Sequence, residues 1–569
     1  MIAGIGNPII RMVITLNRMM QNFSYWLFSI ASDGKIESQF GKSSRFVSDK
    51  VDFEDDDFVI VSDGIVLNKF DILNSGNSLK DYYKSSYDNV CLLKALSGPF
   101  NGLVFNKNER KGIAFGNQTG DSSVFYGFTK DNTLLISNNY NEVWKRCDNR
   151  TINEKAAHFQ LTYGFYADES TIVDSINKVR PGEYIEFTQN GFSIKTYHRF
   201  NFHDKINISI DEAIEQLDVL FRKAVKRCFD KDLEYGFQDH LADLSAGLDS
   251  RMTNVVAKEL GYEGIINISY SQSNSTESKY TNLLSHVLAN PLYYRSLDDV
   301  SFIYDIEKMV KEEFGMAYYC GMTGAYQFLN LIDFSNIGLE HTGQLGDVII
   351  STHGSNFGEV NTESGRNSTM LALRYKPNVE LYSTQEEFNF YTRYFQGTLA
   401  THYVRSNYTY AVSPFIDVEL LAFCASLPND IRENHKLYWN WIDQKYPEYS
   451  NIPSSRLRRY DGMSCRNKIL MYSNRVKGKL KRDGYYVAKI IGLSKTGTSP
   501  DNMNPHTYWY DTNLKMRSFI HQYFDEHICL LDAIPEVKEE AVLMFNSKSA
   551  LDKLMAISLL ATIKQYCGL

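Results

Sequence analysis

Three features are scarce in this 569-residue sequence: cysteine, long apolar runs and an excess of basic residues. The 8 cysteines are scattered, without a CxxC pair or a Cys/His cluster spaced like a zinc finger. This spacing argues against a zinc site of that kind, so we expect reduced, structural thiols.

The first thirty residues look apolar, but Arg11 and Arg18 interrupt them. No run therefore approaches the roughly 18 uncharged residues of a membrane span. A compact signal-peptide core with a small-residue cleavage site is also missing. We accordingly expect a cytoplasmic protein without a membrane span. A strand-like stretch at 23–30 begins just after Met19 and Met20, so either methionine is a candidate start.

The charge balance is slightly acidic, because 60 basic and 68 acidic residues give a net charge of -8. Binding to nucleic-acid phosphates needs a positive surface, so this balance argues against a nonspecific nucleic-acid partner. Small molecules or another protein are the expected partners. The 43% hydrophobic and 22% charged residues are typical of a globular protein. A single core stops growing at about 250–300 residues, so the length predicts two or three domains.

The first third of the chain has the pattern of a mostly β domain. Short apolar or alternating runs, separated by turn residues, occur at 58–61, 102–105, 112–115 and 133–137. Pro181 and Gly182 precede two further runs, 183–187 and 191–194, which predicts a closing hairpin.

The pattern changes near residue 205. Ser209 can cap a helix whose apolar residues recur at helical spacing from Ile210 to Cys228. Predicted strands and helices then alternate: strand 240–244, helix 251–260, strand 264–270 and helix 277–288. This order predicts a parallel, doubly wound sheet.

The last hundred residues, from about 465 onward, have a largely helical pattern. They contain a run of basic residues: Arg475, Lys477, Lys479, Lys481 and Arg482. Charge runs usually lie on a helix face in contact with water, and we expect the same here.

The segment 244–251, with the sequence LSAGLDSR, lies between a predicted strand and a predicted helix. There the helix points its free N–H groups and positive dipole end into the crevice beyond the sheet, where an anion can bind. Gly247 allows a phosphate to approach closely, and the hydroxyls of Ser245 and Ser250 can donate hydrogen bonds. The Asp249 carboxylate suits a Mg²⁺ ion. We therefore predict a nucleotide-binding loop formed by Ser245, Ala246, Gly247, Leu248, Asp249 and Ser250.

No lysine follows the glycine, unlike in the Walker P-loop. The loop instead resembles the SGGxDS loop of the ATP pyrophosphatase families, with Ala246 in place of the first glycine. Together with other segments, it makes the chain resemble asparagine synthetase and its relatives, the β-lactam synthetases and the lasso-peptide cyclases. The resemblance covers about residues 23–450.

One of those segments, 339–347, is similar to the family's glycine-rich turn that ends in a second metal-binding aspartate. The resemblance implies that Gly343 and Gly346 lie at the nucleotide and that Asp347 shares a Mg²⁺ ion with Asp249. Two carboxylates from separate strand ends can clamp the metal bound to pyrophosphate, which one carboxylate does poorly.

Two further segments follow in the family's order. Residues 413–417 resemble its PFLD segment, which we expect to support the site by packing. Residues 432–440 look like the segment whose lysine contacts the phosphates and the charge that develops during amide formation. By this resemblance, Lys436 is the candidate catalytic residue.

The N-terminal region resembles the family's glutaminase domain. Its landmarks are matched at 62–68, 96–105, 116–120, 164–166 and 179–182. The resemblance implies a glutaminase-like, Ntn-type αββα sandwich over 20–204. It implies an ATP-pyrophosphatase domain with a doubly wound parallel sheet and a helical C-terminal region over 205–569.

Three departures from the family bear on function. The glutaminase nucleophile is an N-terminal cysteine, but residue 2 is Ile and Met20 is followed by Gln21. Asp63 replaces the asparagine expected to donate to the oxyanion, and a carboxylate there would repel that charge. Gln344 replaces a glutamate and cannot take a proton. We expect a degenerate domain that does not hydrolyse glutamine.

The resemblance thus implies an ATP-dependent amide ligase that forms AMP and pyrophosphate and uses ATP and Mg²⁺. It would adenylate a small-molecule or peptide carboxylate, such as a surface-sugar uronate or a natural-product precursor, and capture it with an amine donor. Three alternatives stay open: a lasso-type peptide macrolactam cyclase, an ammonia-dependent asparagine synthetase and a noncatalytic scaffold. A homodimer is one possibility for its assembly.

Overall fold

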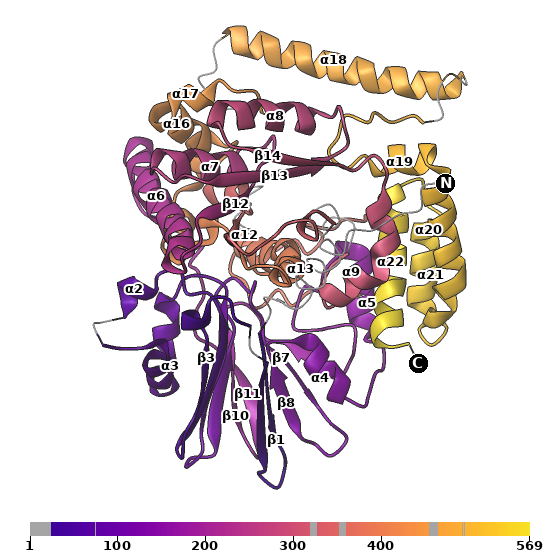
Figure 1. Ribbon diagram of the computed structural model, residues 1–569. Coiled ribbons are helices and arrows are strands. Elements are labelled where there is room, and N and C mark those ends of the chain that lie inside the picture. The colour runs from indigo at the N-terminus through magenta and orange to yellow at the C-terminus, as the bar shows by residue number, and fades with distance from the viewer. Residues whose placement is uncertain are drawn as a thin grey trace, which may run out of the picture.

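The computed structural model describes residues 24–41, 43–73, 76–318, 327–351, 360–454, 465–491, 493 and 496–568. Within them, two antiparallel sheets form one part of the molecule and a parallel sheet surrounded by helices forms another (Figure 1). The expectation of a mixed α/β fold with a parallel sheet is therefore confirmed.

Eleven strands between residues 25 and 196 form the two antiparallel sheets. The first sheet has the order β2 (Ile36–Gly41), β1 (Tyr25–Ile30), β8 (Leu134–Ser137), β7 (Phe125–Phe128), β9 (Ile176–Lys178). The second has the order β11 (Gly191–Thr196), β10 (Glu183–Thr188), β6 (Lys111–Phe115), β5 (Phe100–Asn106), β4 (Phe58–Gly64), β3 (Val51–Glu54). All the predicted runs in this region are strands, and the hairpin after Gly182 is β10 paired with β11.

The two sheets pack face to face because alternate side chains of their strands are apolar. Trp26 and Phe28 of β1 meet Val61 of β4 and Phe105 of β5 in the core between the sheets. Helices cover both outer faces: α3 (Leu79–Asp88) on the second sheet, and α4 (Tyr140–Arg146) and α5 (Glu154–Tyr163) on the first. The layers therefore run helix, sheet, sheet, helix.

The parallel sheet has the order β14 (Leu292–Ser296), β13 (Ile265–Ser271), β12 (Asp239–Asp243), β15 (Ile337–His341), β16 (Ala411–Val412). All four of these pairings are parallel. The chain starts in the middle at β12, proceeds to β13 and β14 on one side, and returns to β15 and β16 on the other. This is the predicted doubly wound order, and its direction reverses between β12 and β15.

Helices α6 (Ile210–Glu234), α7 (Asp249–Glu259) and α8 (Thr276–Leu288) pack around this sheet. Ser209 caps α6 as predicted, in a capping box with Glu212. The helix continues six residues beyond Cys228, where its predicted apolar pattern ends. Buried polar residues in this last part are hydrogen-bonded to other segments. Asp232, for example, accepts hydrogen bonds from His240 and His341 of the sheet.

Further helices frame the region after β15: α11 (Gly346–Ile350), α13 (Thr401–Ser406), α14 (Val418–Ser426) and α16 (Lys436–Lys445). The C-terminal helices α20 (Leu514–His527), α21 (Pro535–Phe545) and α22 (Ala550–Tyr566) form a cluster against α9 (Ile306–Glu312) and α5 (Figure 1). Together with α18 (Cys465–Ile490) and α19 (His506–Thr512), they confirm the predicted helical C-terminal region. Among the described residues, no helix is both long and apolar enough to cross a bilayer.

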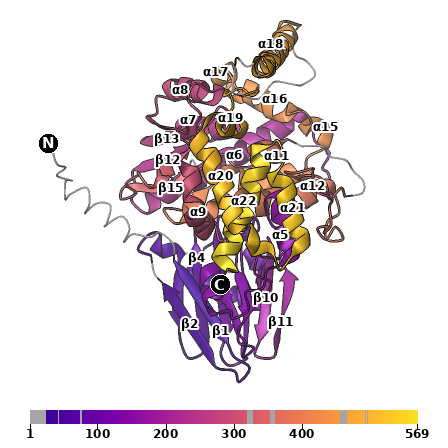
Figure 2. The same ribbon diagram turned by 90° about the vertical axis from the view of Figure 1, so that its right-hand side faces the viewer.

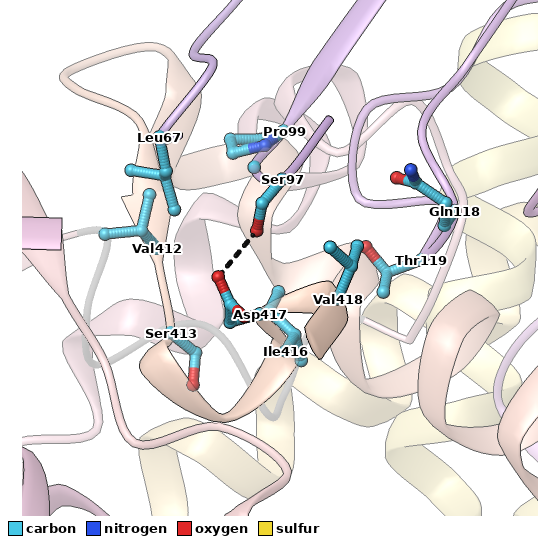
Figure 3. A pocket seen from close by; sticks show the side chains of 11 residues that line it. Leu67, Ser97, Pro99, Gln118, Thr119, Val412, Ser413, Ile416, Asp417 and Val418 are labelled. Atoms are coloured by element: carbon cyan, nitrogen blue, oxygen red, sulfur yellow. Dashed lines mark hydrogen bonds between the residues drawn. The ribbon is translucent and has the colours of Figure 1, made fainter. Parts of the chain in front are cut away.

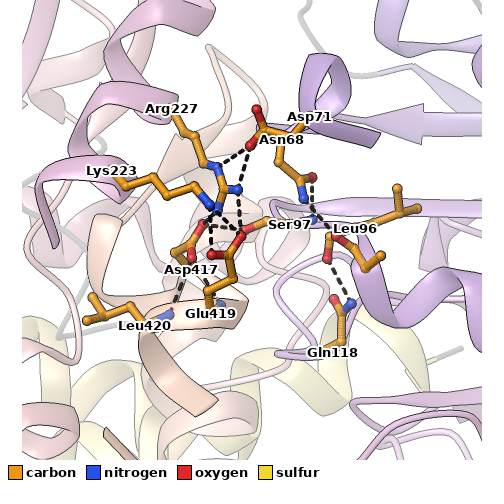
Figure 4. A network of polar contacts seen from close by, with 11 residues as sticks. Asn68, Asp71, Leu96, Ser97, Gln118, Lys223, Arg227, Asp417, Glu419 and Leu420 are labelled. Atoms are coloured by element: carbon orange, nitrogen blue, oxygen red, sulfur yellow. Dashed lines mark hydrogen bonds and ion pairs between the residues drawn. The ribbon is translucent and has the colours of Figure 1, made fainter. Parts of the chain in front are cut away.

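A polar network around the buried Arg227 and Asp417 joins the antiparallel-sheet part to the parallel-sheet part. Arg227 of α6 donates to Asp417 at 2.9 Å and Glu419 at 2.6 Å, and also to Asp71 of α2 (Lys69–Ile72) at 2.5 Å (Figure 4). Asp417 in addition accepts a hydrogen bond from Ser97 Oγ at 3.0 Å. Since the predicted PFLD-like segment supplies Asp417, this segment supports the junction of the two parts.

A small cavity lies beside the Ser97–Asp417 hydrogen bond (Figure 3). Its volume is about 10 Å³, close to the space that one water molecule occupies. Residues 97–99 line it from the first part, and Val412, Ser413 and Ile416 line it from the second. The cavity is therefore part of a closely packed junction and has no room for a substrate.

Candidate functional site

The predicted nucleotide-binding loop lies at the point where the parallel sheet reverses its winding. It connects β12 to α7, and the turn 342–346 connects β15 to α11 beside it. Ligands of open α/β sheets bind at the carboxyl ends of strands that flank such a switch point. The N–H groups of the first turn of α7, which begins at Asp249, lie at this edge.

The two predicted serines meet inside the loop. Ser250 Oγ lies 2.8 Å from Ser245 Oγ and accepts the Ser245 N–H at 2.9 Å, while Gly247 N–H donates to Ser245 Oγ at 3.2 Å. Asn254 adds hydrogen bonds from its side-chain amide to the carbonyls of Asp243 and Ser250. The loop is thus held in one shape by its own polar groups.

The two predicted glycines bring the second turn against this loop. A Cβ on Gly343 would lie 2.2 Å from the Ser250 nitrogen, and a Cβ on Gly346 would lie 2.8 Å from Asp249 Cγ. Only glycine permits so close an approach. Asp347 follows Gly346 directly, so the structure brings the turn that carries Asp347 into contact with Asp249.

Tyr438, in the first turn of α16, contacts Asp249. Its hydroxyl donates to Asp249 Oδ1 at 2.9 Å. Burial raises the pKa of Tyr438 well above its usual value, and the charges of Asp249 and Asp347 raise it further. The hydroxyl therefore stays protonated as a donor. Both aspartates are half-buried, whereas Tyr438 is completely buried.

Lys436 is the first residue of the helix that carries Tyr438. It is half-buried. The structure places Lys436 two residues before Tyr438, and its catalytic role stays a prediction.

Sequence reasoning missed Glu277, in the first turn of α8. Its carboxylate accepts the Ala246 N–H at 2.7 Å. Burial raises the pKa of Glu277, and the hydrogen bond from Ala246 opposes that rise. On the other side of the loop, Ser454 Oγ donates to the Ala246 carbonyl at 3.2 Å. These contacts anchor the loop at Ala246 from two distant segments.

Gln344 is held by two hydrogen bonds. Its side-chain N–H donates to Thr401 of α13 at 2.7 Å, and its main-chain carbonyl accepts from Ser413 Oγ at 2.9 Å. Its side-chain oxygen is buried and has no hydrogen-bond partner among the described residues. A glutamine in this position offers an acceptor oxygen, but it cannot act as a base.

A buried cluster lies at the ends of β12 and β15. Arg405 of α13 forms ion pairs with Asp243 at 3.1 Å and with Glu340. Burial raises the pKa of Glu340 to about 8 although Arg405 opposes the rise, and the negative charge of Asp243 adds to it. These residues are close to the candidate loop but are paired with one another.

A second group of acid and histidine side chains, Asp232, His240 and His341, is also fully buried. Asp232 Oδ2 accepts from His240 Nδ1 at 2.6 Å and from His341 Nε2 at 2.7 Å, while Oδ1 accepts from the Leu339 N–H. These are the distances of direct hydrogen bonds, which leave no space for a cation between the atoms. The triad therefore ties α6 to the sheet and is not a metal site.

In the N-terminal region, Asp63 at the end of β4 is buried and paired. Lys50 Nζ lies 3.3 Å from Asp63 Oδ1 and donates to Ser24 Oγ at 2.8 Å. Tyr410 OH donates to the two Asp63 oxygens at 2.8 and 2.9 Å. Burial lowers the pKa of Lys50, opposed by the charge of Asp63. The carboxylate that replaces the expected asparagine is thus neutralised within the fold.

A cavity of about 30 Å³ lies beside Asp63 and is lined by Asn101, Asn138 and His402 among others. This volume holds about two water molecules. Residues 2 and 21, where the resemblance leads one to expect a catalytic cysteine, lie outside the described residues.

Among the described residues, six cysteines are free thiols. Cys147, Cys228 and Cys424 are buried, Cys567 is half-buried, and Cys91 and Cys529 are exposed.

Comparisons with known proteins add little to this geometry. No protein-family model and no curated protein matches the chain. Among solved structures, glutamine phosphoribosylpyrophosphate amidotransferase from B. subtilis, complexed with ADP and GMP, is 10% identical; the match covers 50% of this chain and 86% of that one, with a TM-score of 0.22. The structure of the allosteric regulatory enzyme of purine biosynthesis matches at 10% identity over 50% and 76%, with a TM-score of 0.21.

These likenesses decide no family. TM-scores this low carry no argument about the fold or the activity of the chain. The Asp249 loop, the 343–347 turn and Tyr438 nevertheless converge at one edge of the parallel sheet.

Proposed function

We propose that the chain is an ATP-dependent amide ligase that forms AMP and pyrophosphate. The observation that carries this proposal is the contact of the Asp249 loop with the turn before Asp347 at the switch point of the sheet. Both carboxylates are half-buried and influence one tyrosine hydroxyl, as expected for two ligands of one cation.

The residues present fit a magnesium ion and a nucleotide. Asp249 and Asp347 supply oxygen ligands of the kind that Mg²⁺ prefers, and the close approach at Gly346 brings the turn before Asp347 against Asp249. When bound, the ion would offset the negative charge of the phosphates. The free N–H groups at the start of α7, together with Ser245 and Ser250, would bind phosphate oxygens. Lys436 would add a positive charge from α16.

The reaction has two steps. A substrate carboxylate oxygen forms a bond to the α-phosphorus of ATP while the bond from that phosphorus to the bridging oxygen breaks, so pyrophosphate leaves and an acyl adenylate results. An amine nitrogen then forms a bond to the acyl carbon, the bond from carbon to the AMP oxygen breaks, and the amine loses a proton. Adenylation is needed because a carboxylate is a poor electrophile.

Gln344 fits a role in positioning the amine. Its buried oxygen can accept a hydrogen bond from an amine N–H, which orients the nitrogen lone pair toward the acyl carbon. Because an amide does not accept the proton, that proton must pass to the substrate or to another group.

We further propose that residues 20–204 form a degenerate amidotransferase-like domain and residues 205–569 a synthetase domain. The pairing of Asp63 with Lys50 and Tyr410 supports a structural role for the N-terminal domain. The Asp63 carboxylate has no hydrogen to donate to an oxyanion, and its own partners already use it as an acceptor. The amine would then come from solution or from the substrate itself, and the location of the reaction would be cytoplasmic.

Pyrophosphate release from ATP and Mg²⁺ tests the proposal, with mass spectrometry of products from a panel of small-molecule and peptide carboxylates with amines. Direct ATP binding is measured in parallel. We expect carboxylate-dependent release in the wild-type protein and none in Asp249→Ala. An Asp249→Ala rate equal to that of the wild type would refute the site assignment. No turnover together with no ATP binding by the wild type would favour the noncatalytic scaffold.

A further inference from the structure

Helix α18 lies apart from the cores of the molecule. It is 26 residues long, about 39 Å, and extends along the end of the molecule where α8 and α16 also lie (Figures 1 and 2). Near its C-terminal end, Lys489 forms a salt bridge with Asp511 of α19 at 3.1 Å. Several of its apolar side chains are exposed to solvent.

These side chains form one stripe. Val476, Leu480, Val487 and Ile490 are between 51% and 67% exposed. Their positions are separated by four, seven and three residues, which places them on the same side of the helix. Globular proteins usually bury such a stripe against their core or against a partner.

The same helix is strongly basic, although the chain as a whole carries a net charge of -8. Its only acidic residue is Asp483. The lysines at 477 and 479, which lie between the apolar positions, are exposed. The basic residues of the helix are Arg466, Lys468, Arg475, Lys477, Lys479, Lys481, Arg482 and Lys489.

We propose that α18 docks the protein on the surface of an anionic lipid membrane, with the helix axis in the plane of the bilayer. An apolar stripe beside a dense positive charge is the combination that this environment satisfies. The stripe enters the boundary between headgroups and acyl chains, and the exposed lysines at 477 and 479 contact the anionic headgroups. The charges of the helix exclude a transmembrane orientation.

Other partners satisfy only half of this pattern. A nucleic acid would use the positive charge but would leave the apolar stripe in water. An uncharged hydrophobic groove on a protein would bury the stripe but would leave the eight basic residues without a counterpart. An anionic membrane supplies both an apolar layer and a dense negative surface, so charge complementarity favours it over these partners. The proposal is independent of the ligase activity, since none of the residues of the stripe belongs to the candidate site.

Vesicle flotation of the full-length protein tests this proposal. Phosphatidylcholine vesicles are compared with vesicles of phosphatidylcholine and phosphatidylserine. We expect binding to the anionic vesicles only, weakened by salt. Leu480→Ser/Val487→Ser should remove the apolar contact and Lys477→Glu/Lys479→Glu the electrostatic one, each lowering the bound fraction about tenfold or more. All four positions are exposed, so folding should be unaffected.

Two matched controls replace exposed residues outside α18: Val219→Ser for the stripe, and Lys515→Glu/Lys548→Glu for the charge. Both should bind vesicles like the wild type. Wild-type protein that fails to float with anionic vesicles would overturn the proposal, as would unchanged binding by both α18 variants. Light scattering provides a further check. A wild-type dimer that becomes monomeric in Leu480→Ser/Val487→Ser would show that a second copy covers the stripe, which also overturns it.

Discussion

Two regions of this protein each place a carboxylate beside a tyrosine hydroxyl, with opposite consequences. In the N-terminal region, Tyr410 donates to Asp63 at 2.8 Å; at the parallel sheet, Tyr438 donates to Asp249 at 2.9 Å. Asp63 is only 1% exposed and lies 3.3 Å from the Lys50 ammonium. Asp249 is half-buried and lies beside the turn that carries a second aspartate.

The difference teaches how the same residue pair can be structural or available to a ligand. A buried carboxylate must be paired, because an isolated buried charge is too costly. Lys50 meets that need at Asp63, so the charge is used within the fold. At the parallel sheet, two acidic residues lie on adjoining loops, and a cation bound by both would offset their charge. Four experiments can break or sharpen this contrast.

The largest effect is expected at the buried pair. Asp63→Asn leaves the Lys50 ammonium without its counterion in the interior and should lower the free energy of unfolding by about 3–5 kcal/mol. Denaturant unfolding measures this change. The double variant Lys50→Met/Asp63→Leu removes both charges and should recover most of the loss. A stability within about 0.5 kcal/mol of the wild type for Asp63→Asn would contradict a structural pair.

At the parallel sheet, we expect loss of turnover without a comparable loss of stability. Asp249→Asn and Asp347→Asn should each lower pyrophosphate release roughly 10²–10³-fold. If both carboxylates act through one ion, the double variant should be little worse than either single variant. If the two single effects instead multiply in the double variant, the carboxylates do not bind the same ion. Asp63→Asn is the matched control, with unchanged turnover per folded molecule.

Gly346→Ala tests the contact between the two loops. The added methyl group would lie 2.8 Å from Asp249 Cγ and from the Phe415 ring, so Asp249 must move. We expect about a tenfold loss of turnover, since small displacements of a ligand-binding group are costly. Gly484→Ala is the control, because a Cβ there meets nothing within 4 Å. Equal activity of the two variants would show that Asp249 does not depend on the turn.

The smallest effects compare the two tyrosines directly. Tyr438→Phe removes a donor to Asp249 and should lower turnover severalfold, which corresponds to an activation free energy higher by about 1 kcal/mol. Tyr410→Phe removes the donor to Asp63 and should instead lower the free energy of unfolding by about 1–3 kcal/mol with little change in turnover. Steady-state assays and denaturant unfolding of both variants separate the two outcomes. Identical behaviour of the two variants would remove the contrast.

Much of the fold could be predicted because its signals are local. The alternation of strands and helices after residue 205 was sufficient for the doubly wound sheet, and Ser209 correctly marked the start of α6. The end of α6 was placed too early. Its last turn is held by Asp232, whose partners His240 and His341 belong to the sheet, so no periodicity within the helix could indicate it.

The structure brings the two loops of the candidate site and their glycines together. The nucleotide-binding roles that the resemblance implies for Gly343 and Gly346 stay predictions. The roles of Ser245, Asp249, Asp347 and Lys436 stay predictions, since no bound ligand tests them. Glu277 and Tyr438 gave no signal in the sequence, because neither residue type is unusual on the surface of a helix and their partners are distant in the chain.

The sequence by itself determined the local elements: where strands and helices begin, which turns need glycine, and that a loop rich in donors enters the helix at Asp249. Only the tertiary structure decided which side chains meet. Asp249 and Tyr438 are 189 residues apart, and Asp63 and Tyr410 are 347 apart. Local propensity carries no information over such separations, because these contacts depend on the order of strands in the sheet and on the packing of the two parts.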